Sequence, residues 1–132
     1  YNKHIVGVGL EVVCASWSRA RRAPRGSRFP GPLRSPGKYI WGLPNLNPQE
    51  IEKVKSGNCM VTYAIKIIYL CMQNNIPGYL ENPQTSLIFL VPAFKKLRRY
   101  NKLHLAVAHM CQYGVAYKKP TSLSSFFRYF IK

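Results

Sequence analysis

The sequence predicts a single α/β domain with a largely parallel sheet. Apolar, β-branched runs alternate along the chain with stretches of helical spacing, which is the pattern of strand–helix–strand units. The 132 residues suit one small domain, taken here as residues 1–132, and a hydrophobic content of 47% is enough to form a core. No internal repeat divides the chain.

The first predicted element is a buried strand over residues 4–13, HIVGVGLEVV. Its Gly7 and Gly9 form an incomplete glycine motif, which close packing explains better than phosphate binding. Residues 14–38 follow, with seven Arg or Lys, four Pro and three Gly. Because so many prolines exclude a long helix or a central strand, we expect a basic loop or lid that is mobile without a partner. The plain alternative is a solvated linker.

A long helix is predicted next. Asn47 suits the N-cap, Pro48 suits the first helical position, and Glu50 completes a capping box. Apolar residues then recur at helical spacing to about residue 73, although the Gly-Asn pair at 57–58 could divide the segment into two helices.

The remainder continues the alternation. It is read as a strand at 77–81, a helix at 86–99 interrupted by Pro92, a strand at 103–110, a turn at 111–123, and a strand or helix at 124–132. The strand at 77–81 is expected to run parallel to the strand before Cys14, with a helix on each side of it in sequence.

The charge balance points to an anionic partner. The chain has twenty Lys and Arg, four Glu and no Asp, for a formal net charge of +16 and a pI near 10.1. DNA or RNA is the first candidate, because Lys and Arg displace counterions from phosphates. An anionic membrane surface is the second candidate, and basic drift in a decayed reading frame is the neutral explanation.

Other partners and compartments find little support. No apolar run is long enough to cross a membrane, so of the two anionic candidates we choose nucleic acid and expect no membrane partner. The four cysteines have the spacing of neither a zinc module nor a disulfide framework, so no metal is expected. A reducing, intracellular location follows, nuclear in a eukaryote.

The basic segment interleaves arginines with aromatic rings, a combination that suits phosphate contact and base stacking. The candidate nucleic-acid-binding residues are Trp17, Arg19, Arg21, Arg22, Arg25 and Arg28, with Lys118 and Lys119 later in the chain.

Three sequence motifs follow three predicted strands: Cys14 in VCASWSRARR, Glu81-Asn82 in LENPQTS, and CQYGVAYKKPT. In open α/β sheets, ligands bind at this carboxyl edge. Their order resembles the catalytic half of the C5-cytosine DNA methyltransferase family, and most closely its divergent phage and mobile-element members. The resemblance covers nearly the whole chain; each motif alone is weak, and their order is moderately specific.

The resemblance implies a Rossmann-like domain of the S-adenosylmethionine methyltransferase type. It implies that Cys14 is the nucleophile that adds to a cytosine ring, and that Glu81 and Asn82 are catalytic residues that contact the flipped base. The implied cofactor is S-adenosylmethionine, and the implied partner is DNA.

The chain also departs from the family pattern. Valines precede Cys14 where the family has Pro, and the strands and glycine-rich loop that hold the cofactor have no counterpart before the cysteine strand. We therefore expect nucleic-acid binding without methyl transfer by this chain. The alternatives are a non-catalytic basic nucleic-acid-binding module and a decayed mobile-element fragment. In both alternatives Cys14 is an incidental thiol and Glu81 caps a helix that begins near Pro83.

Overall fold

The computed structural model describes residues 4–21, 24, 28–100, 102–114, 116 and 120–126. Its strands are β1 (Val8–Glu11), β2 (Gly78–Pro83), β3 (His104–His109) and β4 (Pro120–Ser125). Its α-helices are α1 (Pro48–Gln73) and α2 (Pro92–Arg99), and three short 3-10 helices span Gly37–Tyr39, Leu87–Leu90 and Met110–Tyr113. The α/β class predicted from the sequence is confirmed.

The four strands form one sheet in the order β1-β2-β4-β3. Strand β1 pairs with β2 in parallel, as predicted, whereas β4 pairs antiparallel with both β2 and β3. The largely parallel, Rossmann-like sheet is therefore not confirmed, because two of the three pairings are antiparallel. The difference arises from β4, which returns after β3 and inserts, reversed, between β3 and β2.

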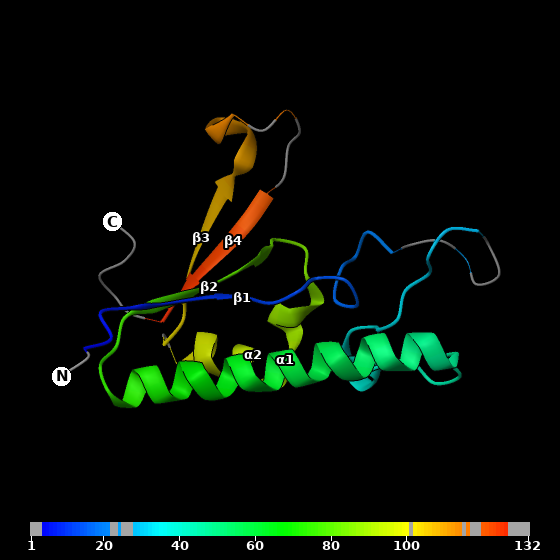
Figure 1. The fold of residues 1–132 in the computed structure, drawn as a ribbon, viewed down its shortest axis with the longest axis horizontal. Helices are drawn as coiled ribbons and strands as arrows, with labels where there is room; N and C mark the ends of the chain where they lie inside the picture. Colours follow the sequence, from blue (N-terminus) through cyan, green and yellow to red (C-terminus); the bar gives the residue numbers. More distant parts are fainter. Residues whose placement is uncertain are drawn as a thin grey trace.

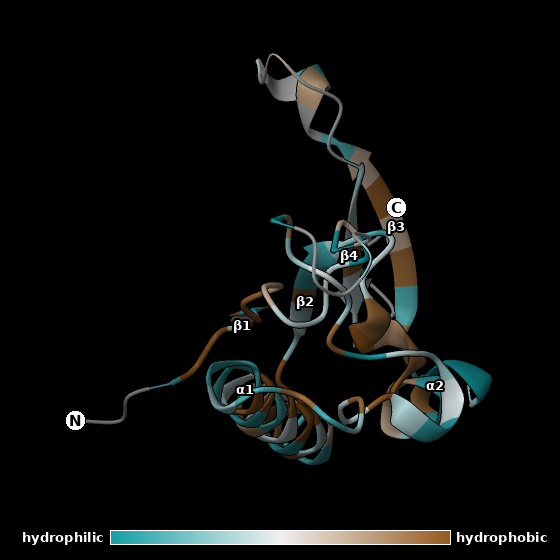
Figure 2. Cartoon of the chain, turned by 90° about the vertical axis from the view of Figure 1, so that its right-hand side faces the viewer, coloured by the Kyte–Doolittle hydropathy of each residue, from teal (hydrophilic) through white to brown (hydrophobic). Residues whose placement is uncertain are grey.

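The domain has two layers. Figure 2 shows α1 and α2 on the same side of the twisted sheet, with α1 beneath β1 and β2. Strands β3 and β4 extend beyond the helical layer, and the 3-10 helix at Met110–Tyr113 lies at their far end (Figure 1). The core fills the space between the layers and includes Val61, Ile68, Leu80, Ile88 and Phe94. One sheet face is thus covered by helices.

Helix α1 forms where its local signals predict. The Asn47 side chain accepts a hydrogen bond from the Glu50 backbone N–H at 2.9 Å, and the Glu50 carboxylate accepts one from the Asn47 N–H at 3.0 Å. The helix is continuous through the Gly-Asn pair at 57–58, so the predicted division does not occur. Its buried residues recur at helical spacing: Val54, Gly57, Val61, Ala64, Ile68 and Cys71.

The other boundaries shift by a few residues. Strand β1 occupies only Val8–Glu11 of the predicted 4–13, and β2 continues past the predicted end to Pro83. Pro92 opens α2 rather than interrupting a longer helix, because proline suits the first helical turn. Strand β4 begins within the segment predicted as a turn.

Gly78 is required by the close pairing at the start of β2. A Cβ at this position would meet the Phe126 ring and the Val8 carbonyl oxygen. Gly78 is buried, and its carbonyl accepts a hydrogen bond from the Phe126 N–H at 3.1 Å. The glycine therefore allows β1 and the end of β4 to approach β2 on both sides. No helix in the described part of the chain is long and apolar enough to cross a membrane.

Candidate functional site at the carboxyl end of strands β1 and β2

The parallel pairing of β1 and β2 brings two predicted motifs to one edge of the sheet. The register aligns Glu11 with Glu81, and Cys14 lies three residues beyond Glu11. Both Cys14 and Glu81 thus sit toward the carboxyl ends of neighbouring strands, where ligands bind in open α/β sheets. At 3.3 Å per extended residue, they are offset along the strand direction by up to about 10 Å.

Cys14 is half-buried and begins a tight turn. Its carbonyl oxygen accepts a hydrogen bond from the Trp17 N–H at 2.9 Å. The position of the Cys14 backbone therefore depends on how Trp17 is held.

Glu81 and Asn82 point to opposite faces of the sheet. Along β2 the residues alternate: Leu80 and Asn82 are buried, whereas Tyr79 is exposed and Glu81 is half-buried. Because the Leu80 side belongs to the core, Asn82 faces the helical layer and Glu81 faces the other side. The two side chains therefore do not enter one cavity from adjacent positions. Glu81 also lies within a strand, so it does not cap a helix near Pro83.

The Asn82 side chain has a structural contact. It is 1% exposed, and its Nδ2 donates a hydrogen bond to the Val12 carbonyl oxygen at 2.7 Å. This bond ties β2 to the backbone between β1 and Cys14. The Asn82 Oδ1 and the Ser122 hydroxyl on the paired β4 residue are buried without a hydrogen-bond partner among the described residues.

Trp17 is fully buried, with none of its surface exposed. Its indole N–H donates to the Gly57 carbonyl oxygen of α1 at 3.2 Å. The Arg34 guanidinium lies over one face of the ring, 3.5 Å from its centroid, and the edge of Trp41 packs at a centroid distance of 6.0 Å. The predicted role of Trp17 as a base-stacking residue does not fit this burial, because no face of the ring is open to a nucleobase.

Arg34 organises this part of the structure, and the sequence interpretation did not select it. It is 2% exposed, and its guanidinium makes five hydrogen bonds to neutral acceptors. Nε donates to the Ser16 carbonyl at 3.2 Å, and the two terminal nitrogens donate to the Ile40 carbonyl at 3.1 Å, Asn58 Oδ1 at 2.6 Å, Ser16 Oγ at 3.0 Å and the Val54 carbonyl at 3.0 Å. All five N–H donors are therefore used.

The charge of Arg34 is buried without a counter-ion. No carboxylate of the described residues pairs with it, and burial is the cause of its pKa shift. Burial lowers the pKa of Arg34 to about 10, which leaves the guanidinium protonated at neutral pH. A sequence signal that could have marked this arginine as internal is its apolar neighbour Leu33, which is also buried.

Gly57 allows the loop to seat against α1. A Cβ there would collide with Ser16 Oγ and would lie 2.9 Å from both an Arg34 terminal nitrogen and the Trp17 indole nitrogen. We name Ser16, Trp17, Arg34 and Gly57 the Arg34 clasp. In the described part of the 14–38 segment, Ser16, Trp17, Leu33 and Arg34 are buried, and the other residues are exposed or half-buried. The expected freely mobile lid is therefore not found at these four residues.

The remaining predicted nucleic-acid-binding residues are near the surface where the structure describes them. Arg19 and Arg28 are exposed, and the Arg28 guanidinium lies 5.4 Å from the Phe29 ring centroid. Arg21 is half-buried, and its Nε donates to the Gly31 carbonyl at 2.9 Å. The other four candidates, Arg22, Arg25, Lys118 and Lys119, lie outside the described residues.

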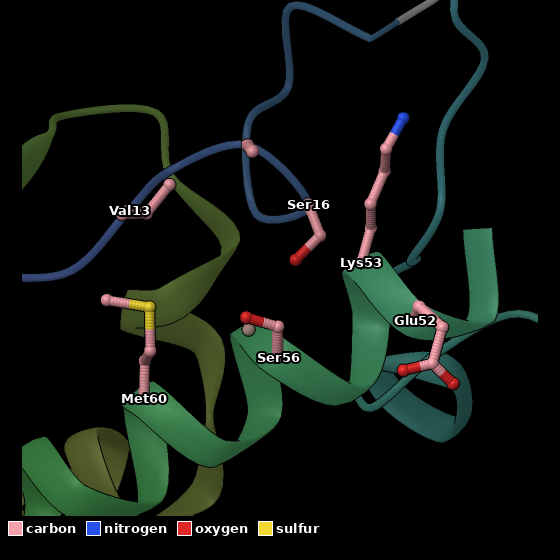
Figure 3. A pocket seen from close by; sticks show the side chains of 8 residues that line it. Val13, Ser16, Glu52, Lys53, Ser56 and Met60 are labelled. Carbon is pink, nitrogen blue, oxygen red and sulfur yellow. The ribbon is translucent and has the colours of Figure 1, made fainter. Parts of the chain in front are cut away.

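A pocket of about 270 Å³ opens between the segment that follows β1 and the first half of α1. It is lined by Val13, Ala15, Ser16, Glu52, Lys53, Ser56, Gly57 and Met60, and neither Cys14 nor Glu81 contributes to it. Figure 3 shows Ser16 on the loop and Ser56 on the helix facing the same opening, with Lys53 extending beside the loop.

The glycine pair does not supply the loop that the methyltransferase resemblance implies for S-adenosylmethionine. Gly9 lies within β1 and Gly7 immediately precedes the strand, so the pair does not form a glycine-rich loop after a strand. We derive no step through S-adenosylmethionine. Within the described residues, no group of three or more His, Cys, Asp or Glu could hold a metal ion. Comparisons of the chain with protein-family models, with curated proteins and with solved structures found no match.

Proposed function

We propose that this chain is a methyltransferase-like domain that binds nucleic acid through the carboxyl end of β1 and β2. The observation that carries the proposal is the parallel register of Glu11 with Glu81, which brings the Cys14 segment and Glu81 to one sheet edge. The exposed Arg19 and Arg28 follow that segment in sequence. With a net charge of +16, such a surface favours phosphate.

The role of each motif residue in this proposal follows from its surroundings. Glu81 lies on the sheet face away from the helices and supplies the carboxylate that would read a base edge. Cys14 supplies a thiol at the same edge. Asn82 holds the two strands together through Val12, so it acts by positioning.

A second candidate is the same nucleic-acid-binding domain without catalysis. It is favoured by the burial of Asn82, by the opposite directions of Glu81 and Asn82, and by the position of Gly7 and Gly9 before and within β1 rather than in a loop after it. Under this candidate Cys14 is dispensable for binding.

Fluorescence anisotropy with short single-stranded and duplex DNA and with RNA, over a range of salt concentrations, tests the proposal. We expect micromolar affinity that falls steeply with salt and depends little on sequence. Affinity that ignores salt would contradict it.

Methyl transfer from labelled S-adenosylmethionine to cytosine-containing DNA separates the two candidates. We expect no transfer by either the wild type or Cys14→Ser, together with equal DNA affinity, which is the outcome that the second candidate predicts. Transfer that depends on Cys14 would favour the catalytic candidate.

A further inference from the structure

We propose that the pocket between the Val13–Ser16 segment and α1 binds a phosphate group, with the buried Arg34 charge behind its wall and Lys53 at its rim. The inference rests on the proposed function, because the phosphate source expected there is a nucleic-acid strand. It adds a defined subsite that neither Cys14 nor Glu81 lines.

The first step is the position of the Arg34 charge. Two residues that line the pocket, Ser16 and Gly57, also touch the guanidinium. A terminal nitrogen of Arg34 donates to Ser16 Oγ at 3.0 Å and would lie 2.9 Å from a Cβ on Gly57. The cation therefore stands directly behind the pocket wall. Since the described residues provide it with no carboxylate, its field is not cancelled inside the protein.

The second step is the set of donors that face the opening. Ser16 Oγ accepts a hydrogen bond from Arg34, which leaves its own O–H to donate and strengthens that donor by polarisation. Ser56 supplies a second hydroxyl from α1, and Lys53 supplies an ammonium group. Figure 3 shows the Ser16 and Ser56 hydroxyls at one opening, with the Lys53 side chain extending away from them beside the loop. Two hydroxyl donors at the opening, a lysine at its rim and the Arg34 charge behind its wall suit the oxygens of a phosphate group.

The third step concerns the rest of the lining. Glu52 also lines the pocket and opposes an anion, but its carboxylate is engaged by Lys55 at 3.0 Å. Val13, Ala15 and Met60 supply an apolar surface beside the donors. A phosphate attached to an organic body, as in a nucleotide, matches this combination better than a free inorganic ion.

The experiment compares two carboxylates introduced on the same helix. Ser56→Asp places a negative charge in the pocket, whereas Thr62→Asp places one at an exposed α1 position outside it. Lys53→Gln and Lys66→Gln form a second matched pair, because both lysines are exposed on α1 and only Lys53 lines the pocket. Arg34 itself is left intact, because its removal would also remove five hydrogen bonds of the fold.

The probes are inorganic phosphate, followed by backbone amide shifts in NMR spectra, and a short single-stranded oligodeoxynucleotide, followed by anisotropy. We expect phosphate to shift the amides of Ser16, Ser56 and Gly57. We expect Ser56→Asp to weaken oligonucleotide binding by about tenfold and Lys53→Gln by about fivefold, with changes below about twofold in Thr62→Asp and Lys66→Gln.

The outcomes distinguish this inference from the proposed function. If the oligonucleotide binds but the pocket variant and its control in each pair weaken oligonucleotide binding equally, the pocket proposal is overturned. The proposal of nucleic-acid binding then still stands. If the oligonucleotide does not bind but phosphate shifts the pocket amides in the wild type and not in Ser56→Asp, the pocket stands with free phosphate as its source. Phosphate-induced shifts that avoid Ser16, Ser56 and Gly57 would also overturn it.

Discussion

At the scale of single residues, the same side chain has opposite roles in different parts of this protein. From composition alone, Arg34 is one of twenty Lys and Arg residues that could bind phosphate. In the structure its guanidinium is buried against the Trp17 ring, and all its N–H donors bind neutral acceptors. Arginine suits this position because its planar fork can serve five acceptors and a ring face together. Burial and donor geometry, which the sequence does not display, decide the role.

Arg34→Met tests the structural role of this arginine. The substitution preserves much of the side-chain volume but leaves the carbonyl groups of Ser16, Ile40 and Val54 without the guanidinium donors. We expect a loss of about 3 kcal/mol in the free energy of unfolding, measured by urea denaturation.

Two further variants serve as comparisons for the unfolding measurement on Arg34→Met. Arg34→Lys keeps the positive charge but not the planar guanidinium with its five donors. Its free energy of unfolding should fall by less than that of Arg34→Met. Arg99→Met, at an exposed position of α2, should change stability by no more than about 0.5 kcal/mol. Equal effects in Arg34→Met and Arg99→Met would refute the clasp.

The cysteines should differ in reactivity according to burial. Burial raises the pKa of the Cys71 thiol, so a smaller fraction of it is thiolate at a given pH. Cys59 and Cys111 are exposed. With iodoacetamide near pH 8, we expect peptide mass spectrometry to show slow labelling of Cys71 and fast labelling of the two exposed cysteines. The difference should disappear in urea; its absence in the native protein would show that Cys71 is accessible.

At the scale of elements, a helix or strand could be predicted from the sequence only where local residues signal it. The start of α1 follows from Asn47, Pro48 and Glu50, and the structure contains both hydrogen bonds of the capping box. Strand β4 carries no comparable signal, because Pro120–Ser125 contains four hydroxyl residues and one leucine. Its burial comes from pairing on both sides with β2 and β3, which is a tertiary effect. Because the sequence did not predict this strand, the predicted sheet also lacked the two antiparallel pairings that β4 makes.

Gly57→Ala has two opposing effects on stability: alanine favours the helix more than glycine does, but its methyl group meets the loop that packs against α1. In an exposed helix interior, this change would stabilise by about 1 kcal/mol. Here the new methyl group would meet Ser16, Trp17 and Arg34, which are buried and cannot swing aside. We expect a net loss of about 2 kcal/mol, measured by thermal and urea unfolding. Ser56→Ala, one residue earlier and exposed, serves as the control; a Gly57→Ala protein more stable than wild type would contradict the clasp.

At the scale of the whole molecule, the excess charge is spread over more than one surface. Arg19 and Arg28 lie in the segment after Cys14, while Lys95, Lys96, Arg98 and Arg99 are exposed on α2. The composition predicts attraction to nucleic acid but cannot say which surface is used. The motif order placed Cys14 and Glu81 at one sheet edge, which β1–β2 pairing confirms, whereas the alternation that separates Glu81 from Asn82 required the strand itself.

Two double variants of equal charge decide which surface carries the binding. Arg19→Gln with Arg28→Gln removes two positive charges beside the proposed edge, and Arg98→Gln with Arg99→Gln removes two from α2. On single-stranded DNA, each phosphate contact contributes about 0.7 to the steepness of log affinity against log salt. The first variant, which removes up to two contacts, should therefore flatten that slope by up to about 1.4 units. The second variant should change it little. The measurement is anisotropy with one labelled single-stranded DNA across a salt series, after circular dichroism has shown that both variants are folded. Equal reductions would mean that the molecule attracts nucleic acid only through its overall charge, and the sheet edge would then have no special part in binding.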